Sequence, residues 1–255
     1  MNNLIRADNV VPNEPGYQTS SAALNFNAAP ATITCLVGPS LSPPKDYLKM
    51  MAAIRLPSRG RLEILGTPVD KMDRKTWKHL RTHTGYVAGS TPLLSVQSGL
   101  INVMLPALYH RIASPAKVEQ RAGEILSQLG CSADVNVLPS FMTVLERCLV
   151  SLARALILEP RLLFIEYPFQ DLGTEDRKFL ASVLADLKQN NHLCIIMAVN
   201  NLPFVQDYAD QIVYVSENKA NCYAGWQEFI ESSDSEVRSY LEDEDSAQIP
   251  HRHDG

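Results

Sequence analysis

The segment from Gly38 to Asp46 has the surroundings of a phosphate-binding loop but lacks its key residues. It follows the apolar run Ile33–Val37 and precedes a helical pattern, which is the context of the motif G-x-x-x-x-G-K-[ST]. Counted from Gly38, the second glycine is Pro43 and the lysine is Pro44. Such a loop binds phosphate through backbone N–H groups at a helix N-terminus, and proline has no N–H. The segment therefore predicts the shape of a phosphate loop without its binding chemistry.

The rest of the chain supplies an alternation of strands and helices that could position this loop. Short apolar runs read as buried strands, and longer stretches with apolar residues three and four apart read as helices. The alternation predicts an α/β fold, and the helical texture is most continuous between residues 92 and 158. Strands are expected at 162–165, 193–199 and 211–215, and helices at about 46–54, 174–189 and 203–210.

The composition argues against several classes of protein, namely those that bind nucleic acids, those that hold a metal through cysteines and those that span a membrane. The 255 residues carry a net charge of −5, which argues against a nucleic-acid partner because such partners select a basic face. Five scattered cysteines without CxxC spacing indicate reduced thiols and no metal site. The first residues lack the apolar core of a signal peptide, and no apolar run approaches the ~18 residues of a membrane span, so a cytoplasmic location is expected.

Several further segments occur in an order and at a spacing that match a known family. They are Leu36–Ser40, Thr84–Val87, Asn102-Val103, Leu152–Leu156, Leu162–Phe169 and Phe204–Val213. With these segments, the chain resembles the nucleotide-binding subunit of ABC transporters over nearly its whole length. The segments Asn102–Pro106 and Ser233–Leu241 resemble the branch of that family that serves MCE-protein (Mla-type) lipid transporters.

The resemblance implies the architecture in more detail than the pattern does. It implies a P-loop NTPase core with a mainly parallel sheet, an antiparallel N-terminal β-subdomain and an inserted helical subdomain at about 89–158. One ABC ATPase-like domain would then cover residues 1–231, and residues 232–255 would form an acidic C-terminal tail. Within that tail, Val237, Tyr240 and Leu241 share one helical face, which predicts docking on a neighbouring subunit.

At the positions that the family uses for hydrolysis, this chain has other residues. The resemblance assigns the Walker B Asp-Glu pair to Glu166 and Tyr167, and the phenol of tyrosine is a poor base at neutral pH. The switch histidine corresponds to Asn200. The glutamine of the Q-loop falls on Gly89, and the nearby Gln97 is out of register.

The signature motif is altered as well. The family's L-S-G-G-Q aligns with Met142-Thr143-Val144-Leu145-Glu146, so side chains replace both glycines that let a helix N-terminus approach phosphate. Thr143 remains suited to cap that helix. Tyr17 is a candidate for stacking on adenine.

In the loop itself, Gly38, Pro39 and Ser40 match the start of the family motif, whereas Lys45 and Asp46 stand near the place of the magnesium-binding hydroxyl. Lys45 could bind a phosphate directly, but a solvated lysine with Asp46 as its partner is favoured. Glu166 could hold a metal, but a buried carboxylate bonded to the backbone is favoured. Tyr167 is expected to pack in the space that a nucleotide would occupy.

These losses at the binding positions, beside intact folding positions, favour a catalytically inactive pseudo-ATPase without cofactor. Its expected partners are a membrane permease, an MCE-protein complex and a second ATPase subunit or a second copy, at the cytoplasmic face of the membrane. The alternative is a weakly active or ATP-binding subunit that uses Mg-ATP to energise phospholipid transport. A soluble adaptor without a permease is a third hypothesis.

Overall fold

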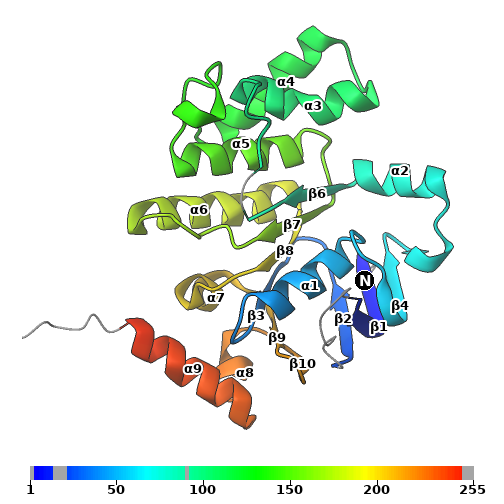
Figure 1. Ribbon diagram of the computed structural model, residues 1–255, viewed down its shortest axis with the longest axis vertical. Helices are drawn as coiled ribbons and strands as arrows, with labels where there is room; N and C mark the ends of the chain where they lie inside the picture. Colours follow the sequence, from blue (N-terminus) through cyan, green and yellow to red (C-terminus); the bar gives the residue numbers. More distant parts are fainter. Residues whose placement is uncertain (1–2, 14–21, 90–91, 249–255) are drawn as a thin grey trace, which may run out of the picture.

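The structure, a computed structural model, describes residues 3–13, 22–89 and 92–248. Its centre is a six-stranded sheet with the strand order β10-β9-β3-β8-β7-β6 (Figure 1). Strands β9, β3, β8, β7 and β6 run parallel, and β10 pairs antiparallel with β9 at one edge. The bounds are β3 Ile33–Val37, β6 Thr84–Val87, β7 Leu162–Glu166, β8 Cys194–Ala198, β9 Gln211–Val215 and β10 Ala220–Tyr223.

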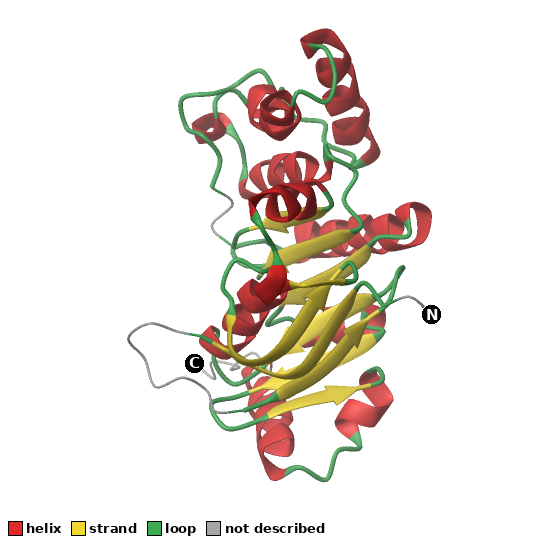
Figure 2. Ribbon diagram, turned by 90° about the vertical axis from the view of Figure 1, so that its right-hand side faces the viewer, coloured by secondary structure: helices red, strands yellow, loops and turns green. Residues whose placement is uncertain are grey.

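A second, antiparallel sheet of four strands has the order β2-β1-β4-β5. It comes largely from the N-terminal part of the chain and lies beside the central sheet (Figure 2). The thiol of Cys222 on β10 donates to the carbonyl of Asn25 on β2 at 3.2 Å, which joins the two sheets. The bounds are β1 Ile5–Pro12, β2 Leu24–Ala28, β4 Pro57–Ile64 and β5 Thr67–Pro68.

Helices cover both faces of the central sheet, and three of them form a separate group at one end of the molecule (Figures 1 and 2). That group is α3 Gly99–His110, α4 Pro115–Gln128 and α5 Val144–Leu156. The others are α1 Ser42–Met51, α2 Arg74–Thr82, α6 Thr174–Asn191, α7 Leu202–Tyr208, α8 Trp226–Ile230 and α9 Ser235–Gln248, with short 3₁₀ turns at Val69–Lys71 and Pro139–Phe141. In the described residues, no helix combines the length and apolar character needed to cross a bilayer.

The apolar strands explain this layering. Every residue of β3, β7 and β8 is buried, as expected for central strands of a parallel sheet that is covered on both faces. Alternate side chains enter two different cores. Cys35 and Ile165 pack with α5, α6 and α7, whereas Leu36 and Phe164 pack with α1 and the antiparallel sheet. The predicted α/β class, with its parallel core and antiparallel N-terminal sheet, is confirmed.

The first helix begins earlier than the sequence pattern predicts. Helix α1 starts at Ser42 and not near Asp46, so Pro43 and Pro44 lie in its first turn. Proline is tolerated there because the first N–H groups of a helix have no partner within the helix. The expected start was wrong because the two prolines were read as part of the loop.

The C-terminal helix corrects the prediction for the tail. Val237 and Tyr240 of α9 are buried within this chain, at 0% and 4% exposure, and Leu241 packs against the same core. The Tyr240 ring lies 5.7 Å from that of Tyr214 on β9. The apolar stripe of α9 is therefore used within the chain and is not free to dock on a neighbouring subunit.

Candidate functional site

The loop that follows β3 is shaped by close packing against β9. A Cβ atom on Gly38 would lie 2.1 Å from the carbonyl oxygen of Val215, so a side chain at this position would clash with backbone. Pro39 and Ser40 are exposed at the turn. Packing alone thus requires the glycine that resembles the start of a phosphate loop.

The start of α1 offers few donors to a phosphate. Pro43 and Pro44 are buried and supply no N–H groups, and Leu41 at the N-cap position makes no side-chain capping bond. Asp46, half-buried just beyond the first turn, adds negative charge near this end of the helix, where a bound anion would need positive charge. The helix N-terminus that would bind phosphate is therefore poor in donors.

Glu166, the last residue of β7, is the centre of a hydrogen-bonded network. Its side chain is only 5% exposed, and one carboxylate oxygen lies 3.0 Å from Nζ of Lys45 on α1. The same oxygen accepts the backbone N–H of Gly89 at 3.2 Å, and the other accepts the phenol of Tyr86. The prediction of a solvated Lys45 was wrong, because this side chain reaches the end of β7.

The network determines the ionisation of Glu166. Burial opposes the charged form, yet hydrogen bonds from Tyr86, Lys45 and Gly89, together with the charge of Lys45, hold the pKa of Glu166 below its usual value. Burial and the neighbouring Glu166 charge raise the pKa of Tyr86. Glu166 is thus ionised, and its negative charge is balanced by Lys45. The resemblance would instead balance this charge with a metal ion.

Tyr167 closes the gap between β7 and the loop. Its backbone has a φ of 43°, in the left-handed region, and its N–H donates to Ala198 on β8 at 2.8 Å. The phenol donates to the carbonyl of Leu41, and the residue is 5% exposed. Burial, followed by the charges of Glu166 and Asp46, raises the pKa of Tyr167, so the phenol stays protonated. The phenol thus joins the residue that follows β7 directly to the loop before α1.

Helix α5 begins with a complete capping box. The Thr143 hydroxyl accepts the N–H of Glu146 at 3.2 Å, and the Glu146 carboxylate accepts the N–H of Thr143 at 2.7 Å. The predicted N-cap role of Thr143 is confirmed. Val144 is 37% exposed, Met142 is buried and Leu145 packs against the core. The N-terminus of α5 is closed by its own side chains, and a carboxylate stands where an incoming anion would approach.

Of the other positions taken from the resemblance, Gly89 lines the same hollow as Val144, Glu166 and Tyr167, whereas Asn200 and Gln97 do not line it. Asn200 is exposed after β8, and the next residue, Asn201, caps α7 by accepting the N–H of Phe204. Gly89 contributes only its backbone N–H, and Gln97 accepts the amide of Asn102. Tyr17 lies outside the described residues. In the described part, no three side chains of His, Cys, Asp or Glu are grouped as a metal site.

Sequence reasoning missed two members of the network. Tyr86 lies on β6, next to β7, where it pairs with Phe164 in parallel register. Since parallel strands end at the same edge, its position one residue before the end of β6 could have indicated a contact with Glu166. The carbonyl of Leu41, which accepts the Tyr167 phenol, left no signal in the sequence because any residue supplies a carbonyl.

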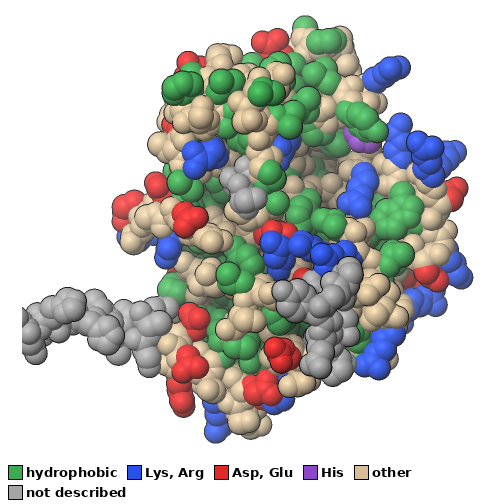
Figure 3. Space-filling view, in the orientation of Figure 1, with side chains coloured by type: hydrophobic (Ala, Val, Ile, Leu, Met, Phe, Trp, Pro, Cys, Tyr) green, Lys and Arg blue, Asp and Glu red, His purple; other side chains and the backbone are tan. Residues whose placement is uncertain are grey.

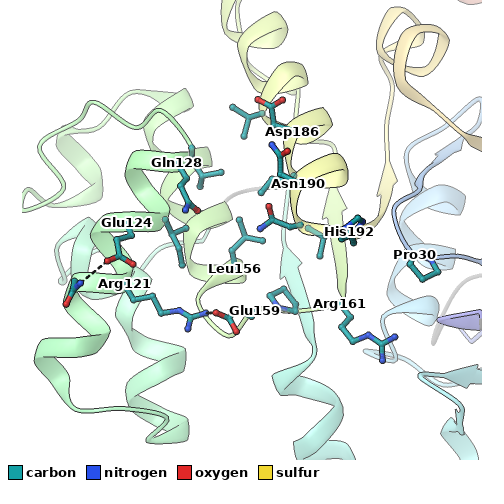
Figure 4. A pocket seen from close by; sticks show the side chains of 18 of the residues that line it. Pro30, Arg121, Glu124, Gln128, Leu156, Glu159, Arg161, Asp186, Asn190 and His192 are labelled. Atoms are coloured by element: carbon teal, nitrogen blue, oxygen red, sulfur yellow. Dashed lines mark hydrogen bonds and ion pairs between the residues drawn. The ribbon is translucent and has the colours of Figure 1, made fainter.

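Neither of two hollows in the described residues combines the size of a nucleotide site with its expected place at the carboxyl ends of the strands. The hollow beside Glu166, Tyr167 and Arg147 has a volume of about 120 Å³, below the roughly 300–1,000 Å³ of typical ligand pockets. A larger hollow of about 1110 Å³ separates α4 from α6, with the ion pair of Arg121 and Glu159 (2.7 Å) at its floor (Figure 4). It opens near the residues that precede β7 and β8, whereas ligands of parallel sheets bind at the carboxyl ends of the strands.

Replacing Lys45 by methionine is expected to lower the free energy of unfolding by about 1–3 kcal/mol, because Glu166 then loses a charged partner while it stays buried. Lys45 is 39% exposed, which keeps the effect below that of a fully buried pair. Urea denaturation measures it, with Lys49→Met on the same helix as the control.

The effect of Lys45→Met is expected to shrink as the pH falls below 4.5, the unshifted value for Glu166. The pKa of Glu166 is lowered in the folded state, so its contribution is present above the unfolded pKa and is lost as the pH falls through the folded one. Equal losses for the Lys45 and Lys49 variants at neutral pH would show that the ion pair contributes nothing.

Comparisons with known proteins agree on one family. The sequence profile described as "ABC transporter" matches residues 22–170. The chain is 32% identical over 168 residues to the uncharacterized ABC transporter ATP-binding protein YbbA of Escherichia coli (strain K12), covering 66% of this chain and 73% of that protein. It is 22% identical to the methionine import ATP-binding protein MetN 2 of Paraburkholderia xenovorans, covering 82% of this chain but only 54% of that longer protein.

A solved structure shows the same fold. The dimeric ATP-binding cassette MJ0796, in a post-hydrolysis state with ADP and Pi, superposes with a TM-score of 0.78 at 19% identity, over 86% of this chain and 98% of that one. The profile match covers more than half of the chain, and the fold and the order of the motifs agree with it. The chain therefore belongs to the ABC transporter family, as a member with the ATPase-domain fold.

Proposed function

We propose that this chain is a catalytically inactive ABC subunit, a pseudo-ATPase that docks on a membrane permease. The observation that carries the proposal is the direct connection between the loop and β7. Lys45 neutralises Glu166 at 3.0 Å, and the Tyr167 phenol is bonded to the carbonyl of Leu41. These contacts support the proposal because protein groups occupy the place that the resemblance gives to magnesium, and Tyr167 packs where a nucleotide would be expected.

The alternative is an ATP-binding subunit that energises lipid transport with these unusual residues. It would require Mg²⁺ to displace Lys45 from Glu166, and the half-exposed position of Lys45 would permit that exchange. It would also require the Tyr167 phenol to leave Leu41. Because both changes must occur before phosphate can enter, the inactive subunit is the proposal that the geometry supports better.

A groove between the core and the three-helix group is the place where we propose that the permease docks. It has a volume of about 340 Å³ and is lined by Thr82 and His83 from the core and by Ile112, Val118 and Leu158 from the helical part. Ile112 is 46% exposed at its rim. An exposed apolar side chain beside a groove suits the apolar face of a short helix from a partner. The lipid-transport assignment, with MCE proteins in the complex, rests on the resemblance of Asn102–Pro106.

Replacing Ile112 by glutamate is expected to abolish copurification with a membrane permease that copurifies with the unmodified chain, because a charge would be buried against the docked helix. An effect of about 2 kcal/mol, or roughly thirtyfold in affinity, corresponds to an interface hot spot. Ile230→Glu on α8, where the isoleucine is 41% exposed, is the matched control. Copurification that survives in the Ile112 variant, or fails equally in the control, would contradict the docking site.

A further inference from the structure

The edge of the molecule formed by α2 and β4 carries a dense set of cations (Figure 3). Helix α2 contains four Lys or Arg residues and no Asp or Glu between Arg74 and Thr82. Lys71 precedes the helix, and strand β4 adds two arginines. We call the exposed members the basic face: Arg59, Arg61, Lys71, Arg74, Lys75 and Lys78.

Some members of the basic face have acidic or capping neighbours within the chain. Arg61 pairs with Glu63 at 2.6 Å, and Asp73 caps α2 by accepting the N–H of Thr76 at 2.8 Å. In the part of the chain that the structure describes, Lys75 and Lys78 form no ion pair. Helix α2 is therefore a cationic element on a chain whose net charge is −5.

The opposite charge lies at the other end of the molecule. Helix α9 carries three successive acidic residues, Glu242, Asp243 and Glu244, and Figure 1 places it far from α2. A molecule polarised in this way is oriented by an anionic surface, with the basic face toward it and the acidic helix away from it.

Apolar side chains adjoin the basic face. The guanidinium of Arg81 lies over the Trp77 ring at 5.5 Å and donates to the carbonyl of Ala53 at 3.1 Å. This bond ties the end of α2 to the segment with Ile54 and Leu56, which are 43% and 48% exposed. Cations beside exposed aliphatic side chains suit the boundary between lipid headgroups and acyl chains.

We propose that the basic face is a binding surface for anionic lipid headgroups at the membrane. Each Lys or Arg held near an anionic bilayer contributes attraction, and several together hold a peripheral protein in a fixed orientation. The residues that end α2, Thr82 and His83, line the groove at which we place the permease. The lipid contact goes beyond the proposed function, since it needs neither the permease nor a loss of ATPase activity.

The experiment is cosedimentation of the purified full chain with phosphatidylcholine vesicles, with and without phosphatidylglycerol. Binding is expected only with the anionic lipid, and high salt is expected to abolish it. The double variant Lys75→Gln, Lys78→Gln is expected to bind about thirtyfold more weakly, since two cations are lost. Glutamine matches lysine in helix propensity, so α2 should persist, which circular dichroism checks.

The matched control is Arg177→Gln with Lys178→Gln, which removes the same charge from exposed positions of α6. It is expected to bind anionic vesicles within about twofold of the unmodified chain. Equal loss in both double variants, or equal binding to neutral vesicles, would overturn the proposal. If the unmodified chain did not bind anionic vesicles at all, the proposal would also be overturned. If, in that case, the Lys75 and Lys78 double variant no longer copurified with the permease, the basic face would instead bind an acidic protein surface.

Discussion

The purified chain is expected to release no phosphate from Mg-ATP above the background rate. Loss of a single group that stabilises charge in a transition state costs about a hundredfold to a thousandfold in rate. Here several such groups are replaced, since the loop has Pro44 in place of its lysine and β7 ends in Glu166-Tyr167. Tyr167, with its raised pKa and its bond to Leu41, can neither accept a proton from water nor approach one.

Repair of the loop is expected to create nucleotide binding only when the contact to β7 is also removed. Pro43→Gly, Pro44→Lys and Lys45→Ser together restore the pattern of a phosphate loop and free Glu166 for Mg²⁺. Adding Tyr167→Gly removes the phenol from the loop and suits the φ of 43°. With Mg-ATP at about 100 times its dissociation constant, the quadruple variant would gain about 2.7 kcal/mol, or roughly 5–10 °C in melting temperature.

Two further variants distinguish the effect of the prolines from that of the Tyr167 phenol on nucleotide binding. Pro39→Gly changes a proline of the same loop that lies before the helix, and it is expected to show no shift with Mg-ATP. The triple loop variant with Tyr167 intact is expected to show a smaller shift than the quadruple variant. If the triple variant alone gave the full shift, the prolines would be the whole cause and the phenol would play no part.

The fold was predictable because burial on both faces of a parallel sheet leaves a strong pattern. The continuous apolar runs of β3, β7 and β8 admit few other structures, and the alternation with helices fixes a parallel core. The beginning of α1 was harder to predict, because proline is typical both of loops and of first helical turns. The apolar stripe of α9 was visible, but a stripe does not tell which surface it covers.

The sequence predicted which residues occupy the candidate site, but it did not predict which of their side chains contact one another. Order and spacing placed Glu166 and Tyr167 at the end of β7 and Thr143 at the start of α5. Lys45 was expected to be solvated, because its contact with Glu166 joins residues 121 positions apart that only the sheet brings together. The bond from Tyr167 to Leu41 uses a backbone carbonyl, for which a sequence carries no mark.

Phosphate release by the unmodified chain is the most direct test of the claim that protein contacts have replaced the nucleotide. The measurement uses millimolar Mg-ATP over a range of protein concentrations, beside Lys45→Met and Glu166→Gln variants prepared in the same way. The account predicts a rate that equals buffer at every concentration and is the same for all three proteins. A rate that rises in proportion to the protein and disappears in the Lys45 or Glu166 variant would contradict it and show that this pair works in catalysis.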